Sequence, residues 1–216
     1  MKEVIRHMIA SNMLILLCLS TSAQELRFGI NYDKKIVPRL EIDTKVQLRT
    51  IVNQANSFYA IAQLGMDYKI SDNISVAGSV RYSTAHSEID EKINEEINEK
   101  LRYTADFKLS TKRFDNGTKI KNRLRYQYSA VITGDDKNYV RNKLSIDYKL
   151  TRRMKPYVAV EPYLLLDNQK IRKLRFYLGS EFELKNNELE FCFIVEGKSR
   201  DKDVSMYYKA GIHYKF

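Results

Sequence analysis

The last thirteen residues of the sequence alternate between apolar and polar side chains. Apolar residues take the even positions from 204 to 216, and polar or small residues take the odd positions from 205 to 215. Because successive side chains of a strand point to opposite faces, this period of two predicts a strand with one apolar and one polar face. The same period recurs along most of the chain without a competing helical period. The pattern therefore predicts an all-β fold.

Turn-forming residues divide the alternating segments from one another. Asp72-Asn73 and Asn116-Gly117 are typical turn sequences. We expect ten strands, near residues 37–50, 56–70, 74–85, 99–111, 119–132, 139–150, 156–166, 172–184, 188–197 and 204–216. Residues 25–33 also alternate, and they predict either a further short strand at a barrel seam or, with two longer segments divided differently, twelve strands.

Three prolines lie at or inside these expected strands. Proline has no amide hydrogen to donate to a strand ladder. We place Pro38 and Pro156 at strand starts and Pro162 at a bulge.

Residues 1–23 differ from the rest of the chain. Lys2 and Arg6 give a basic start, residues 13–19 are apolar, and residues 20–23 are small. This order predicts a secretory signal peptide over 1–23 and a mature domain over 24–216. The apolar run is shorter than the roughly 20 residues that a transmembrane helix needs. Cleavage would leave Cys192 as the only cysteine, so we expect no intramolecular disulfide.

Alternating strands suit both a soluble barrel or sandwich and a membrane barrel. Several segments here have about 12 to 14 residues, whereas about 9–11 suffice to cross a bilayer at a tilt and soluble strands average about 5–6. Aromatic residues near strand ends are typical of membrane girdles. We therefore predict a transmembrane antiparallel up-and-down β-barrel of about 10 strands (10–12) in the outer membrane of a Gram-negative cell. Both chain ends and the shorter turns would face the periplasm, and residues 86–98 would lie outside.

The closing strand predicts a signal for outer-membrane assembly. Its alternating apolar residues end on a terminal phenylalanine, a pattern that resembles the one read by the barrel-assembly machinery. The residues that we assign to this signal are Tyr208, Ile212, Tyr214 and Phe216.

The polar faces of the expected strands carry charges of both signs. A ten-stranded barrel encloses little space, so these charges would lie close together in its lumen. Unpaired charges in a dry interior are costly, and we expect them to pair across a narrow lumen that is not a general diffusion pore. The predicted charge network contains Arg49, Arg81, Arg123, Arg125, Arg141, Glu161, Arg175 and Glu181.

Several strand sequences resemble a family of uncharacterised bacterial outer-membrane β-barrel proteins, domain of unknown function 2490. They are LGMDYKI at 64–70, VRY at 80–82, RLRY at 123–126, PY at 156–157 with Glu161, and the longer segments 40–49, 139–150 and 175–184. The resemblance spans nearly all of the expected mature chain. It implies the barrel fold and the outer-membrane location, and it brings no catalytic residues.

Two histidines remain after the expected cleavage, His86 and His213. A lipid-modifying enzyme would need a Ser–His pair. His86 lies beside Ser83, Thr84 and Ser87 at the expected outer rim, but their spacing is not distinctive, so we take it as a weak rim candidate. His213 would join the lumen charges. Neither zinc-ligand spacing nor a nucleotide fingerprint is found, so we expect no catalytic residues, no cofactor, no metal and no enzyme activity.

The formal net charge is +10. A basic balance can indicate nucleic-acid binding, but here the charges alternate along strands, so we expect no nucleic-acid partner. We expect a monomer in contact with outer-membrane lipid and lipopolysaccharide. The predicted role is structural or ligand-binding; the alternatives are a narrow transport channel and a lipid-modifying enzyme.

Overall fold

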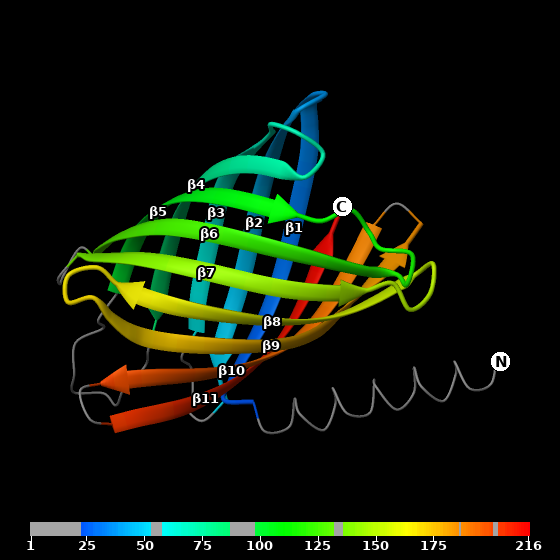
Figure 1. Cartoon of the computed structure of the whole chain (residues 1–216). Coiled ribbons are helices and arrows are strands. Elements are labelled where there is room, and N and C mark those ends of the chain that lie inside the picture. The colour runs from blue at the N-terminus through cyan, green and yellow to red at the C-terminus, as the bar shows by residue number, and fades with distance from the viewer. Residues whose placement is uncertain (1–22, 53–57, 87–97, 132–135, 186, 201–202) are drawn as a thin grey trace.

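The computed structural model describes residues 23–52, 58–86, 98–131, 136–185, 187–200 and 203–216. Within them eleven strands form one closed barrel in chain order (Figure 1). The strands are β1 (Glu25–Val37), β2 (Leu40–Ile51), β3 (Phe58–Lys69), β4 (Ile74–His86), β5 (Asn98–Ser110), β6 (Thr118–Val131), β7 (Lys137–Tyr148), β8 (Met154–Leu165), β9 (Lys170–Leu184), β10 (Asn187–Arg200) and β11 (Asp203–Lys215). Among the described residues, none forms a helix long and apolar enough to cross a membrane.

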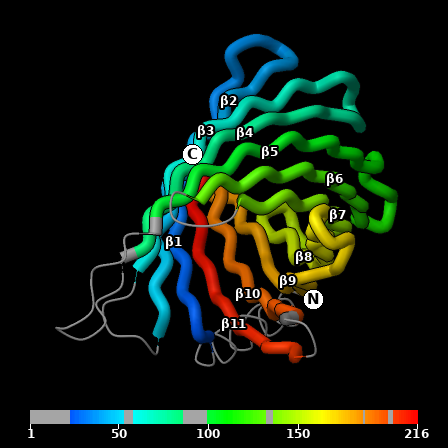
Figure 2. The backbone as a smooth tube through the Cα atoms, turned by 90° about the vertical axis from the view of Figure 1, so that its left-hand side faces the viewer, coloured from blue at the N-terminus to red at the C-terminus, as the bar shows by residue number. Residues whose placement is uncertain are grey.

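The barrel closes through a parallel seam between β1 and β11, which corrects the expectation of a wholly antiparallel sheet. Glu25 lies opposite Lys209, and the pairing continues in parallel to Asn31 and Lys215. In Figure 2 the blue β1 lies beside the red β11. An up-and-down barrel with an odd number of strands must close in parallel, because its first and last strands run the same way. The alternating residues 25–33 thus belong to a seam strand, and the twelve-strand division is wrong for the described chain.

The proline positions refine the expected strand boundaries. β1 continues to Val37, and Pro38 lies in the turn before β2, so the expected strand start at this proline is wrong. Proline fits a turn because its fixed φ suits the first central position and its missing N–H is not needed there. Pro162 lies where the β7–β8 ladder is interrupted, between the pairs Arg141–Tyr163 and Leu144–Val160.

The barrel has two ends, which we call the turn end and the loop end. Connections after the odd-numbered strands lie at the turn end, where the β1–β2 hairpin projects at the top of Figure 1. Connections after the even-numbered strands lie at the loop end. Because β1 and β11 run in parallel, β1 starts at the loop end and Phe216 lies at the turn end. This corrects the expectation that the strands begin and end on the same side. The segment 86–98, which was expected outside, falls largely on residues 87–97, beyond the described residues.

The two faces of the wall differ sharply in chemistry. The outer face exposes large apolar side chains, such as Leu64 (59 % exposed) and Phe176 (52 %). The inner face buries charged groups, and Glu161 and Glu196 have no exposed surface (0 %). The arrangement of a soluble ligand-binding barrel, with its apolar face inward, is therefore not the one formed.

Candidate functional site

Glu161 on β8 is the centre of the inner charge network. Its Oε1 accepts hydrogen bonds from Arg123 (2.9 Å) and Arg141 (2.8 Å). Its Oε2 accepts from the hydroxyls of Tyr177 (2.5 Å) and Tyr163 (3.3 Å). A carboxylate with four donors from β6, β7, β8 and β9 joins four consecutive strands on the inner face of the wall.

A second set of ion pairs lies beside the seam. Lys209 contacts Glu196 at 3.0 Å and Glu25 at 3.1 Å. Glu196 also accepts a hydrogen bond from Arg175, and Glu25 accepts one from Arg27 at 2.7 Å. These contacts join β1, β9, β10 and β11 through the buried Glu196 and the half-buried Glu25.

Seven of the eight residues of the predicted charge network line lumen cavities, and the eighth, Glu161, is buried beneath Arg123 and Arg141, to which it is hydrogen-bonded. Arg123, Arg141 and Arg175 are paired as described above, and Arg125 forms a bidentate pair with Asp106, with both contacts at 2.5 Å. Arg49 and Arg81 donate to the amide oxygens of glutamines 47 and 63, and Arg49 also forms a long ion pair with Glu25 at 3.7 Å. Glu181 has no cation within 4.0 Å among the described residues, so the network is only partly cross-paired.

The half of the lumen near the loop end contains a basic cavity of about 480 Å³, which we call the basic chamber. Eight arginines, six lysines and two glutamates are among its lining residues. Within the described chain, six of these cations have no carboxylate oxygen within 4.0 Å: Lys45, Arg81, Lys100, Arg102, Lys143 and Lys173. Ion pairs within the described part of the chain therefore do not account for these six cations.

Strand register places several of these cations directly beside one another. Arg81 on β4 is opposite Arg102 on β5, and the other like-charge pairs of chamber cations across neighbouring strands are Arg27–Arg49, Arg123–Lys143, Arg125–Arg141 and Lys173–Lys198. Like charges in register destabilise a sheet. Three buried guanidinium nitrogens in this chamber also have no hydrogen-bond partner among the described groups: Arg27 Nη2, Arg123 Nε and Arg141 Nε. These three buried donors are thus unsatisfied within the described chain.

The lumen near the turn end has a different balance of charge. A cavity of about 540 Å³ there is lined by six acidic and five basic residues. It shares Lys45, Arg123 and Arg125 with the basic chamber, so these residues separate the two spaces. The positive charge of the lumen is thus concentrated toward the loop end.

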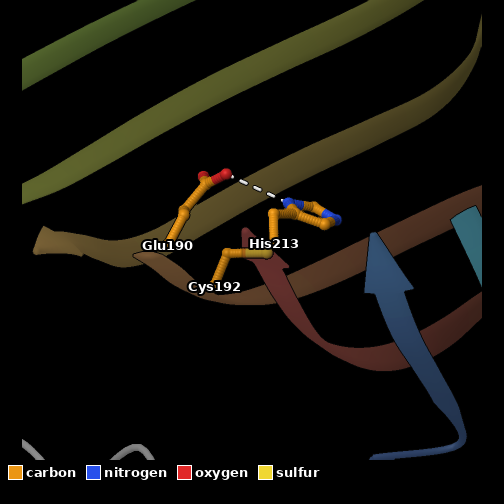
Figure 3. A group of neighbouring side chains, drawn as sticks. All are labelled: Glu190, Cys192 and His213. Carbon is orange, nitrogen blue, oxygen red and sulfur yellow. Dashed lines mark hydrogen bonds and ion pairs between the residues drawn. The ribbon is translucent and has the colours of Figure 1, made fainter. Parts of the chain in front are cut away.

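Glu190, Cys192 and His213 form a separate group on the inner wall (Figure 3). Their ligand atoms lie within 4.8 Å of one another, and in the described chain these are the side chains grouped closely enough to hold a metal ion. His213 Nδ1 lies 3.0 Å from Glu190 Oε2, and the hydroxyl of Tyr157 donates to Glu190 Oε1. Sequence spacing did not indicate this group, because the register of β10 and β11 brings it together. The sequence indicated only that positions 190, 192 and 213 lie on inward faces of their strands.

The remaining predicted residues lie outside the lumen or outside the described side chains. The backbone of His86 ends β4 opposite Phe58, and its side chain is not among those described. At the turn end of β11, the rings of Tyr214 and Phe216 meet edge to face, with centroids 4.7 Å apart. The role of the β11 residues in assembly stays a prediction.

The family model described as "Protein of unknown function (DUF2490)" matches residues 28–203, which is most of the chain. The chain belongs to the DUF2490 family. The resemblance found in the strand sequences is confirmed by this match. A search of curated proteins gives no match for this DUF2490 member.

The DUF2490 barrel is also similar to a solved structure, LpxR from Salmonella typhimurium. The TM-score is 0.54 at 6 % sequence identity, and the likeness covers 82 % of this chain and 84 % of LpxR. At such low identity the likeness concerns the fold alone. It agrees with an all-β barrel as the architecture of this DUF2490 chain.

Proposed function

We propose that this DUF2490 barrel lies in the outer membrane and binds an anionic ligand, bearing phosphate or carboxylate groups, in the basic chamber. The observation that carries the proposal is the set of six lining cations that have no described carboxylate within 4.0 Å. Enclosed charges of this kind are costly unless they are paired. A bound anion would supply the missing negative charge.

Arginine geometry supports phosphate or carboxylate as the ligand group. A guanidinium presents several N–H donors in a plane and binds such oxyanions through two parallel hydrogen bonds. The neighbouring Arg81 and Arg102, with the partnerless Arg123 Nε and Arg141 Nε, line one cavity. A volume of about 480 Å³ is in the usual range of small-molecule sites.

The outer-membrane location is supported by the exposed apolar band, the long strands and the expected signal peptide. With the turn end in the periplasm, the loop end and its basic chamber face outward from the cell. The phosphates of lipopolysaccharide are one source of the ligand. Outer-membrane lipid around the wall and the barrel-assembly machinery during biogenesis complete the proposed partners of a monomer that binds no nucleic acid.

Calorimetric titration of the mature protein in neutral detergent with inorganic pyrophosphate tests this proposal. We expect saturable binding at low salt that weakens as salt is raised. The double variant Arg81→Gln/Arg102→Gln should bind at least about tenfold more weakly, a loss of about 1.4 kcal/mol. Lys34→Gln/Lys35→Gln removes the same charge from the exposed β1–β2 hairpin and should bind normally. Equal losses in both double variants would refute a specific chamber.

A narrow channel is the second candidate function, because the basic chamber and the turn-end cavity share lining residues. The charge asymmetry of the lumen favours anions over cations. Planar bilayer recordings test this function: sustained steps with an anion-selective reversal potential support a channel, and a silent bilayer rejects it. We propose no enzyme activity, since among the described side chains His213 is hydrogen-bonded to Gln47 and Glu190 and to no serine.

A further inference from the structure

Glu190 and Cys192 are two residues apart on β10 and both line the basic chamber. His213 on β11 lies directly opposite Glu190 in the strand register. Figure 3 shows the three side chains on one face of the wall, with the dashed contact between Glu190 and His213. We propose that Glu190, Cys192 and His213 bind a Zn²⁺ ion. This inference does not rest on the proposed anionic ligand.

The donor types suit zinc. Thiolate sulfur, imidazole nitrogen and carboxylate oxygen are its usual protein ligands, and three of them leave a fourth coordination position open. Zinc holds these donors at about 2.0–2.3 Å, so tetrahedral ligands lie about 3.5 Å apart. The present spread of up to 4.8 Å closes by side-chain rotation on two adjacent strands. The open position would face the basic chamber, which all three residues line.

Two glycines make space for the ligand side chains. A Cβ at Gly29 of β1 would lie 2.6 Å from His213 Cδ2. A Cβ at Gly211 would lie 3.0 Å from Cys192 Sγ. Each ligand side chain therefore occupies the space above a residue that has no side chain of its own.

Cys192 supports the metal site independently of this spacing. It is a free cysteine with 6 % of its surface exposed. Within the described chain its thiol has no hydrogen-bond partner, and it points into the group that contains His213 and Glu190. An enclosed thiol beside an imidazole and a carboxylate is a ready zinc ligand.

The proton balance of binding involves Gln47. Arg49 donates to Gln47 Oε1, which directs the amide Nε2 of Gln47 toward His213 Nε2 at 2.8 Å. His213 Nδ1 therefore carries the proton and donates it to Glu190. Zinc at Nδ1 would release the Cys192 thiol proton into solvent, and the single imidazole proton would move from Nδ1 to Nε2 by exchange with water, so His213 stays neutral and one proton is released in total. Gln47 would turn its oxygen toward that nitrogen, as an outer-shell partner of a zinc-bound histidine does. Arg49 could turn to Glu25, now 3.7 Å away.

The charge of the loaded site is compatible with its basic surroundings. A thiolate and a carboxylate bring two negative charges to a divalent ion, so the complex with neutral His213 is formally neutral. The empty site carries the single negative charge of Glu190, so loading removes that charge, and Lys45 and Lys143, which line the same chamber, would face a neutral complex and not a cationic one.

Cobalt titration of the mature protein in neutral detergent tests the site. We expect one Co²⁺ per chain with the near-ultraviolet absorption of a cobalt–thiolate bond, and loss of that absorption when Zn²⁺ is added. Cys192→Ser should abolish the absorption. Gln47→Leu should weaken Co²⁺ binding by about 10–100-fold, the usual effect of losing an outer-shell partner.

Matched variants separate this site from general metal binding. Glu190→Gln should weaken Co²⁺ binding, whereas Glu183→Gln, the same change at the turn end of β9, should leave it unchanged. Heat-dependent gel mobility identifies the folded barrel in each variant. A wild-type protein without the thiolate absorption would overturn the proposal, and so would an absorption that persists in Cys192→Ser.

Discussion

Arg81 on β4 and Arg102 on β5 lie directly opposite each other, and both side chains line the basic chamber. Neither has a carboxylate oxygen of the described chain within 4.0 Å. Two like charges in register repel, so this pair costs stability in the empty barrel. Sites that bind ligands commonly hold groups that the fold alone would not favour.

Arg102→Gln should stabilise the barrel and weaken its anion binding. The substitution removes one member of the repulsive pair, whose described partner is only the Ser129 hydroxyl at 3.4 Å. We expect the free energy of unfolding to rise by up to about 1 kcal/mol. Urea unfolding in lipid vesicles measures this change, and pyrophosphate titration measures the accompanying loss of affinity.

The matched variant is Arg125→Gln on the adjacent β6. Arg125 forms a bidentate pair with the buried Asp106, so its loss leaves a buried carboxylate without its partner. We expect a loss of about 3–5 kcal/mol. If Arg102→Gln destabilised the barrel by a similar amount, the distinction between cations paired with a carboxylate and cations without one would be contradicted.

Glu161→Ala should be among the most destabilising single changes in the lumen. Its carboxylate has no exposed surface (0 %) and accepts hydrogen bonds from two arginines and two tyrosines. Removing it leaves buried guanidinium groups unpaired, at a cost of about 3–5 kcal/mol. The midpoint of heat-dependent gel mobility measures this effect. Glu188→Ala, at the turn end of β10, is the control, and an equal shift in both variants would argue against a central role for Glu161.

Gly179→Ala should destabilise the wall by about 1–3 kcal/mol through overpacking. A Cβ at this position would lie 2.7 Å from the backbone oxygen of Phe191 and 2.6 Å from Tyr157 Cζ. The backbone contact cannot be relieved by a side-chain rotation. Gly78→Ala is the comparison, because its nearest contact would be an ordinary 3.7 Å to the oxygen of Thr104. In thermal unfolding, Gly179→Ala should therefore lower the midpoint temperature more than Gly78→Ala does.

Much of the barrel could be predicted from the sequence, because a period of two reports directly on the two faces of a strand. The apolar residues around Leu64 and Phe176 face outward, and Glu161 and Arg141 face inward, as the alternation predicted. The seam was harder to predict. The barrel closes in parallel only if the number of strands is odd. In the sequence, that number depended on whether residues 25–33 formed a strand of their own.

The sites were less predictable than the fold. Which inward residues lie level with one another depends on strand stagger, which the sequence does not state. The excess of cations in the basic chamber therefore appears only once the strands are in register, and so does the meeting of Cys192 with His213. The lumen charges were expected to pair with one another, and this expectation was wrong for Arg81. Its partner among the described residues is the amide oxygen of Gln63, which carries no charge.

Labelling of single cysteines tests the direction of the two faces. In a Cys192→Ser background, we expect a lipid-soluble thiol reagent to label Leu124→Cys, which is on the exposed outer face. Arg123→Cys, one residue away, should react with a small water-soluble reagent from the lumen and escape the lipid-soluble one. The reverse pattern would place the charged face in the membrane and refute the proposed location.

The central claim is that the basic chamber holds an anion. The most direct measurement is anomalous diffraction from crystals of the mature protein soaked in bromide or tungstate. The account predicts anomalous peaks inside the lumen, within contact of Arg81, Arg102 and the nearby Lys100 or Lys173, which disappear in Arg81→Gln/Arg102→Gln. A lumen without such peaks, with anions bound only on the outer surface, would contradict it.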